Sequence, residues 1–126
     1  MDPVVFRRCQ HVITENERVI ESVKTLIQND LVNFGRLMNA SHDSLKDDYE
    51  VSCMEIDLLV NLARQVPGVL GSRITGGGFG GCTVNLIKED AIPEFSRQVL
   101  QKYQEKTGIA AKVFISTAVN GAEKIK

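Results

Sequence analysis

The chain turns through Gly71-Ser72-Arg73-Ile74-Thr75-Gly76-Gly77-Gly78-Phe79-Gly80-Gly81-Cys82, where five of the six residues from Gly76 to Gly81 are glycine. Glycine loses more backbone freedom on folding than any other residue, so an ordinary turn gains nothing from so many of them. Such a cluster indicates a loop with φ angles that side chains forbid, or one that a ligand, often a phosphate, or another piece of backbone approaches closely.

Both flanks of this glycine-rich loop have the pattern of β-strands. Residues 69–75 form a short apolar run, and residues 82–87 alternate apolar with polar side chains. Residues 111–117 are rich in β-branched and aromatic side chains, which predicts a third strand. A helix expected over residues 91–107 would separate the last two strands, and this order favours parallel pairing through a right-handed crossover.

Three helices are expected before the strands. In residues 3–28 the following residues recur at helical spacing and predict a buried apolar stripe: Val5, Cys9, Val12, Val19, Val23 and Leu26. Asp30 is a suitable N-cap for a second helix. Ser52 and Glu55 have the spacing of a capping box before a third helix, which Pro67-Gly68 ends. Helices on one face of a small sheet make an α+β two-layer sandwich.

Composition and charge describe an ordinary globular domain. The chain has 126 residues, enough for one domain, of which 43% are hydrophobic and 25% charged. A formal net charge of −1 argues against a broad electrostatic grip on nucleic acid or on an acidic membrane. The sequence has no bilayer-spanning apolar run and no signal-peptide pattern, and its three cysteines are widely spaced. We therefore expect a cytoplasmic protein with reduced thiols.

The glycine-rich loop does not fit the common nucleotide-binding motifs. Gly76, Gly78 and Gly81 have the spacing of a dinucleotide fingerprint, but that motif leads from a strand into a helix, and here a strand pattern follows. A Walker loop is excluded because no Lys-Ser or Lys-Thr pair follows the glycines. Spacing alone supports a tight structural hairpin and a ligand-binding loop about equally.

Other polar groups are weaker candidates for chemistry. Ser41-His42-Asp43 has the residue types of a catalytic triad, but consecutive helical residues point in different directions. The acidic cluster of Asp43, Asp47, Asp48 and Glu50 could hold magnesium, although a solvated helix end is the favoured interpretation. With only two histidines, a histidine-based metal site is not expected, and no residue has the pattern of a general base.

Three stretches of the chain follow one another in a specific order: Phe34-Gly35-Arg36-Leu37-Met38-Asn39-Ala40-Ser41-His42-Asp43-Ser44-Leu45, then Asp47-Asp48-Tyr49-Glu50-Val51-Ser52-Cys53, then Gly71 to Val84. Together they resemble the C-terminal region of galactokinases, members of the GHMP superfamily of small-molecule kinases. The resemblance covers essentially all 126 residues. Three motifs in the right order are far more specific than a glycine pattern alone.

The resemblance implies a ferredoxin-like two-layer α/β sandwich with additional N-terminal helices, in which residues 1–126 form a single C-terminal domain. It implies that a glycine-rich third motif lines the nucleotide and substrate cleft, namely Gly76, Gly77, Gly78, Phe79, Gly80 and Gly81. Phe79 would pack against the other domain or onto the local core. The sugar-binding signature, the phosphate loop and the catalytic aspartate of galactokinases lie upstream of the matched region, so no catalytic or metal-binding residue is expected here.

The resemblance also implies a reaction, in which the intact enzyme converts galactose and ATP, with magnesium, into galactose 1-phosphate and ADP. The partner of this chain would be the N-terminal galactokinase domain, and the isolated chain would be inactive and hold no cofactor. No nucleic acid or membrane partner is expected. The alternative is a stand-alone module with a ferredoxin-like fold that binds a small ligand or another protein.

Overall fold

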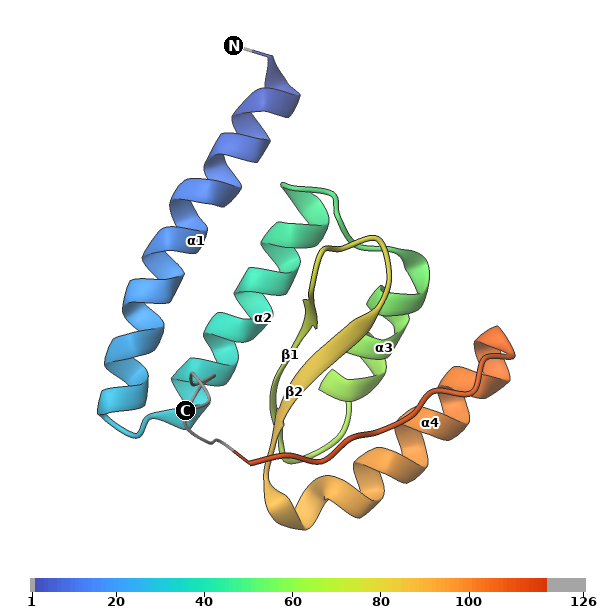
Figure 1. Ribbon diagram of the computed structural model, residues 1–126. Coiled ribbons are helices and arrows are strands. Elements are labelled where there is room, and N and C mark those ends of the chain that lie inside the picture. The colour runs from blue at the N-terminus through green and yellow to red at the C-terminus, as the bar shows by residue number, and fades with distance from the viewer. Residues whose placement is uncertain (1, 118–126) are drawn as a thin grey trace, which may run out of the picture.

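The structure, a computed structural model, describes residues 2–117 of the chain. All four expected helices and the first two expected strands are present (Figure 1). The elements follow in the order α1 (Pro3–Ile27), α2 (Leu31–Asp47), α3 (Met54–Arg64), β1 (Val69–Thr75), β2 (Cys82–Ile87), the short 3-10 helix η1 (Glu89–Ala91) and α4 (Ile92–Thr107).

Short-range interactions set most of the helix ends. Asp2 caps α1 by accepting a hydrogen bond from the Val4 N–H at 2.7 Å, and Asp30 caps α2 by accepting one from the Asn33 N–H at 3.2 Å. Gly108 follows α4 with a left-handed φ of 73°, as expected for the residue that ends a helix.

The capping box predicted before α3 is wrong. Cys53 is the N-cap residue, and its side chain makes no capping hydrogen bond. Ser52 instead donates its hydroxyl to Asp57 Oδ1 at 2.6 Å. The spacing of Ser52 and Glu55 requires Ser52 at the N-cap, but the helix begins one residue later, so Ser52 lies before the capping position.

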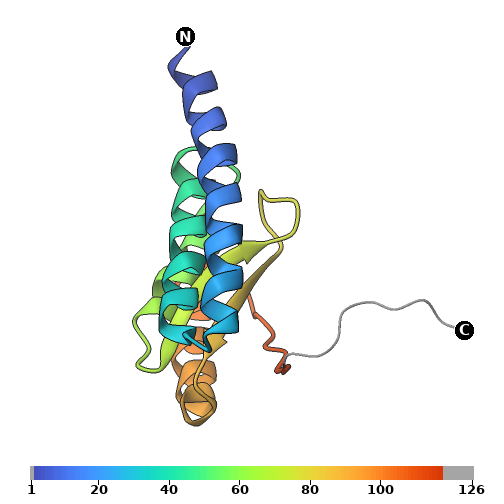
Figure 2. The same cartoon turned by 90° about the vertical axis from the view of Figure 1, so that its left-hand side faces the viewer.

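The sheet is an antiparallel hairpin of β1 and β2, closed by the glycine-rich loop (Figure 1). Pairing runs from Thr75 opposite Cys82 to Val69 opposite Ile87, with an irregularity between Val69 and Gly71. α2 and α3 pack against the hairpin, and α1 packs against α2 (Figures 1 and 2). The expected α+β class, with additional helices at the N-terminus, is confirmed.

The prediction of a third strand over residues 111–117 is wrong, and so is the prediction that this strand pairs in parallel through a right-handed crossover. This segment has no secondary structure. Ala111 and Val113 are half-buried against the core, whereas Phe114 and Ile115 are exposed. A strand needs a backbone partner as well as side chains that suit one, and no backbone hydrogen bond reaches this segment from residues 2–117.

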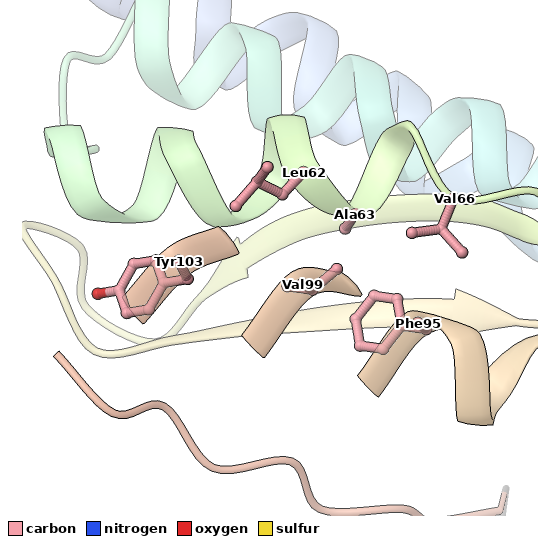
Figure 3. Packing of buried hydrophobic residues seen from close by; sticks show 6 residues of the cluster. All are labelled: Leu62, Ala63, Val66, Phe95, Val99 and Tyr103. Atoms are coloured by element: carbon pink, nitrogen blue, oxygen red, sulfur yellow. The ribbon is translucent and has the colours of Figure 1, made fainter. Parts of the chain in front are cut away.

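Two apolar clusters hold the helices on the hairpin. The larger joins α3 and the turn after it to α4 (Figure 3): Leu62, Ala63, Val66, Phe95, Val99 and Tyr103. The smaller joins α3 to β1 through Ile56, Val60 and Ile74. Full burial of an aliphatic or aromatic side chain stabilises the fold by about 1.5–3 kcal/mol, so these clusters fix α3, α4 and the hairpin relative to one another.

The apolar stripe expected to be buried on α1 is exposed. Its members are between 49% and 58% exposed at Val5, Val12, Val19, Val23 and Leu26. The face of α1 that is buried is a more polar one, at His11 and Thr25. The prediction is wrong for residues 2–117 because α2 contacts a different side of the helix. In the same residues, no helix is long and apolar enough to cross a membrane.

Candidate functional site

The glycine-rich loop, residues 76–81, joins β1 to β2 beside the connection between α2 and α3 (Figure 1). Its backbone is unusual at every residue but one. Gly76, Gly78, Gly80 and Gly81 have φ angles between 89° and 142°, and Phe79 has a φ of 61°. Side chains strongly disfavour such angles, so the conformation itself requires glycine at four of the five glycine positions.

A single contact anchors the loop. The Phe79 N–H donates to the Val51 carbonyl at 2.5 Å. A Cβ at Gly78 would lie 2.8 Å from that carbonyl oxygen and 2.9 Å from the Val51 Cβ, so only glycine fits against Val51. The Val51 N–H in turn donates to the Leu45 carbonyl at 3.0 Å. The three stretches that carry the family resemblance therefore meet at this contact.

The other loop glycines face open space. A Cβ at Gly76, Gly77, Gly80 or Gly81 would meet no heavy atom of residues 2–117 within 4 Å. Gly77 differs from the rest because its φ also lies outside the range that disfavours side chains. Neither backbone conformation nor packing within the described residues explains the glycine there. At this position, close approach by something outside the described residues is favoured over a purely structural turn.

The chemical groups that the loop offers are backbone groups. Phe79 is the only residue of the loop whose N–H has a loop or turn partner among residues 2–117. The remaining N–H groups are free to bind an anion such as a phosphate. The Phe79 side chain is 73% exposed, so the expectation that it packs onto the local core is wrong. Its packing against another domain stays a prediction.

Two arginines of α1 brace the connection that carries Val51. Arg8 donates to the Asp48 carbonyl at 2.6 Å and to the Glu50 carboxylate at 2.8 Å, and Arg7 reaches the same carboxylate at 3.3 Å. The hydrogen bond from Arg8, followed by the charges of both arginines, lowers the pKa of Glu50. Glu50 has a left-handed φ of 58°, so these contacts hold a strained residue directly before the loop anchor.

One face of α2 closes the outer edge of β1. The Asn39 side-chain oxygen accepts from the Ser72 N–H at 2.9 Å, and His42 Nδ1 accepts from the Ile74 N–H at 3.0 Å. One turn earlier, Gly35 allows the two backbones to touch, because a Cβ there would lie 2.1 Å from the Leu70 carbonyl oxygen. The first stretch of the resemblance thus positions the strand that leads into the loop.

The buried His42 has a structural role. Because Nδ1 accepts from Ile74, Nε2 carries the proton and donates to Asp57 Oδ1 at 3.2 Å. The side chain is 2% exposed, and burial lowers its pKa, partly opposed by the hydrogen bond to Asp57. With both ring nitrogens engaged and no access to solvent, His42 is not placed to act as a general base.

The neighbours of His42 in sequence point elsewhere, so the triad is correctly rejected. Ser41 donates to Glu15 Oε2 at 2.6 Å, and Asp43 pairs with Arg64 at 3.0 Å. Two other members of the acidic cluster are also engaged elsewhere: Glu50 pairs with the arginines of α1, and Asp48 accepts a hydrogen bond from the Ser44 hydroxyl at 3.2 Å. No group of three or more His, Cys, Asp or Glu residues that could hold a metal ion occurs within residues 2–117.

The sequence reasoning missed a groove between α1, α2 and the hairpin. It has a volume of about 660 Å³ and reaches Thr75, the last residue before the loop. Its walls mix polar and apolar side chains, among them Glu15, Arg18, Val19, Phe34, Leu37, Arg73, Val84 and Leu86. Arg18 pairs with Glu15 at 2.9 Å. Residues from four elements make this groove, and the apolar stripe of α1, which contributes Val19, was the only signal in the sequence that touched it.

The hairpin, its glycine-rich loop and the contacts from α1 and α2 form one packed unit, in which the loop presents backbone N–H groups without a partner in residues 2–117. A family model described as GHMP kinases C terminal matches residues 22–105, and the chain belongs to this family.

Individual relatives agree with the family. The chain is 51% identical to a galactokinase of Clostridium acetobutylicum over 98% of this chain and 32% of the relative, and 47% identical to one of Enterococcus faecalis with the same coverage. A crystal structure of Lactococcus lactis galactokinase complexed with galactose superposes with a TM-score of 0.83 at 43% identity, covering 86% of this chain and 28% of that one. The resemblance to galactokinases is therefore confirmed.

A more distant relative extends the likeness across the superfamily. A crystal structure of L. major mevalonate kinase in complex with R-mevalonate matches with a TM-score of 0.56 at 28% identity, over 72% of this chain and 26% of that one. The chain spans about a third of the length of the curated galactokinases it matches.

Proposed function

We propose that this chain is the C-terminal domain of a galactokinase, the enzyme that transfers the γ-phosphate of ATP to galactose and yields galactose 1-phosphate. The observation that carries the proposal is the 51% identity to a galactokinase over 98% of the chain. The structure supports it through the convergence of the three stretches on the loop anchor at Val51.

In this proposal the glycine-rich loop forms one wall of the nucleotide and substrate cleft. Phosphoryl transfer depends chiefly on positioning and on stabilisation of charge, which backbone N–H groups can supply without a side chain. The N–H groups of the five loop glycines, Gly76, Gly77, Gly78, Gly80 and Gly81, would be available to a phosphate, and the open space at Gly77 would allow it to approach. Phe79, exposed at the tip, would contact the N-terminal domain.

The remaining parts of the site belong to the rest of the intact enzyme. The N-terminal domain would be the partner of this chain, and it would provide the base, the sugar-binding groups and the phosphate loop. ATP would bring magnesium as its counter-ion, and residues 2–117 offer no cluster of ligands to which we assign that ion. A cytoplasmic location is part of the same proposal.

A chimera tests the proposal. In the Clostridium acetobutylicum galactokinase, the region matching this chain is replaced by residues 1–126, and galactose-dependent ADP formation is measured. We expect activity within about tenfold of the parent enzyme. A Gly77→Ala variant should lose at least tenfold in kcat/KM, whereas Gln101→Ala, an exposed change on α4, should lose nothing. A chimera that folds cooperatively yet has no activity would contradict the proposal.

The stand-alone module remains the second candidate, supported by the free N–H groups of the loop and the groove beside it. Calorimetric titration of the 126-residue chain with galactose, ATP and galactose 1-phosphate separates the two. The galactokinase proposal expects no tight binding and no galactose-dependent ATP turnover by the chain alone. Micromolar binding of one of these ligands would favour the module.

A further inference from the structure

The two hydrogen bonds nearest the glycine-rich loop that join the hairpin to the rest of the described chain come from Ile74 and Phe79. The Ile74 N–H, at the entry to the loop, donates to His42 Nδ1 on α2 at 3.0 Å. The Phe79 N–H, within the loop, donates to the Val51 carbonyl at 2.5 Å. Only residues 75–78 lie between these two points of attachment. The shape of the loop therefore depends on where His42 and Val51 lie relative to each other.

A single carboxylate oxygen connects the two points of attachment. Asp57 Oδ1, in the first turn of α3, accepts a hydrogen bond from His42 Nε2 at 3.2 Å. The same oxygen accepts one from the hydroxyl of Ser52, the residue after Val51, at 2.6 Å. We call this arrangement the Ser52–Asp57–His42 bridge. It joins the side chain that holds the loop entry to the neighbour of the residue that holds the loop itself.

Within the bridge, His42 is held as an acceptor for the Ile74 N–H. Donation from Nε2 to Asp57 selects the tautomer in which Nδ1 has a free lone pair, whereas a protonated ring would have no acceptor. Burial is the main cause of the lowered pKa of His42, and Arg64 of α3 acts in the same direction. The carboxylates of Asp57 and Asp43 oppose this shift. The side chain is 2% exposed, so water does not replace either of its partners.

We propose that His42 is a positioning residue for phosphate transfer. Held by Asp57, it fixes the entry of the glycine-rich loop relative to Val51, so that the loop N–H groups meet the phosphates of the nucleotide together. This inference rests on the proposed function, which places the loop at the phosphates. Donors stabilise charge only where they are placed before the reaction, and a misplacement of about 1 Å can cost about 100-fold in rate.

Two amide substitutions at His42 separate positioning from stability. Asparagine places its side-chain oxygen where histidine has Nδ1, so His42→Asn keeps the acceptor for Ile74 and loses the donor to Asp57. Glutamine reaches the place of Nε2, so His42→Gln keeps the donor and loses the acceptor. Both changes remove ring volume from a buried site, and we expect both to lower the free energy of unfolding. Val99→Ala, in the cluster between α3 and α4, is a destabilised control that touches neither the bridge nor the loop.

Steady-state kinetics of the chimera give the first readout. We expect His42→Gln to raise the KM for ATP and to lower kcat/KM for ATP by about tenfold or more. His42→Asn and Val99→Ala should stay within about threefold of the unsubstituted chimera. A smaller folded fraction alone would lower kcat and leave the KM for ATP unchanged. Equal kcat/KM values for the asparagine and glutamine variants would overturn the inference and leave the proposed function standing.

Amide hydrogen exchange in the 126-residue chain gives a second readout that needs no activity. The Phe79 N–H reports on the loop anchor, which His42 does not contact by a hydrogen bond. We expect this amide to exchange about tenfold or more faster in His42→Gln than in His42→Asn, because the loop entry is released only in the former. Exchange of the Phe79 amide at the same rate in the two variants would show that His42 does not position the loop, whether or not the chimera transfers phosphate.

Discussion

Alanine substitutions at two adjacent loop glycines should have opposite effects on stability. At Gly78, alanine must adopt a φ near 94°, which costs about 1–2 kcal/mol. Its Cβ must also move away from the Val51 carbonyl, now 2.8 Å away, at a further cost of about 1–3 kcal/mol. Alanine also restricts the unfolded chain more than glycine does, which offsets about 0.4–1 kcal/mol of this destabilisation. We therefore expect Gly78→Ala to destabilise the chain by about 1–5 kcal/mol.

Gly77→Ala is the matched partner of this change. It has open space around the Cβ position and a φ that alanine tolerates, so the unfolded-state effect alone should stabilise the chain by about 0.4–1 kcal/mol. Urea denaturation of the 126-residue chain, followed by circular dichroism, measures both. Equal free energies of unfolding for the two variants would refute the claim that Val51 anchors the loop at Gly78 and leaves Gly77 for an external contact.

Three further predictions concern the scaffold and its exposed face. Gly35→Ala should destabilise the chain by about 3 kcal/mol or more in chemical denaturation, because its Cβ would lie 2.1 Å from the Leu70 carbonyl oxygen. A decrease in the free energy of unfolding of less than about 1 kcal/mol would show that α2 can move away from β1. Burial lowers the pKa of His42 and His11 in the folded state. The free energy of unfolding should therefore be highest above the unfolded-state pKa of about 6.5 and should fall as the pH drops below that value, because the unfolded chain takes up protons first. A free energy of unfolding that stays constant from pH 7 to 5 would contradict this assignment. Val23→Glu on the exposed stripe of α1 should change the stability of the 126-residue chain by less than about 0.5 kcal/mol. In thermal unfolding it should destabilise the chimera by about 2 kcal/mol or more, because we expect the intact enzyme to bury the charge. Equal effects in the chain and the chimera would show that the stripe stays exposed.

Local signals in the sequence were sufficient to predict the four helices, the first two strands and the loop between them. Asp30 and Gly108 mark helix ends by interactions within a few residues, and the alternation in residues 82–87 reports a strand that has its partner next to it in the chain. The loop glycines follow directly from the φ angles they adopt. Such features depend on neighbours that the sequence itself places close by.

Two predictions failed because they depended on partners farther away. The apolar stripe of α1 has the helical spacing of a buried face, yet α2 contacts a more polar side at His11 and Thr25. Residues 111–117 have strand-forming side chains but no adjacent backbone. Periodicity shows that a surface is suited to burial or pairing, but it does not show which element covers it.

The contacts that hold the glycine-rich loop and β1 in place could not be predicted from the sequence, because they also join residues far apart in the chain. Asn39 and His42 accept hydrogen bonds from backbone N–H groups of a strand about 30 residues later in the chain. Val51 contacts the loop although α3 and β1 lie between them in the sequence. His42 attracted attention as a triad member because its residue type is catalytic in other settings. Its burial and its two hydrogen bonds, which only the structure reveals, make it a structural residue.

The most direct test of the central claim is galactose-dependent phosphate transfer from ATP by the chimera that carries residues 1–126 in place of the matching region of the Clostridium acetobutylicum galactokinase. We expect a kcat/KM for galactose within about tenfold of the parent enzyme, and a loss of at least tenfold on Gly77→Ala without a loss of stability. A chimera that unfolds cooperatively near the temperature of its parent but transfers no phosphate would contradict it.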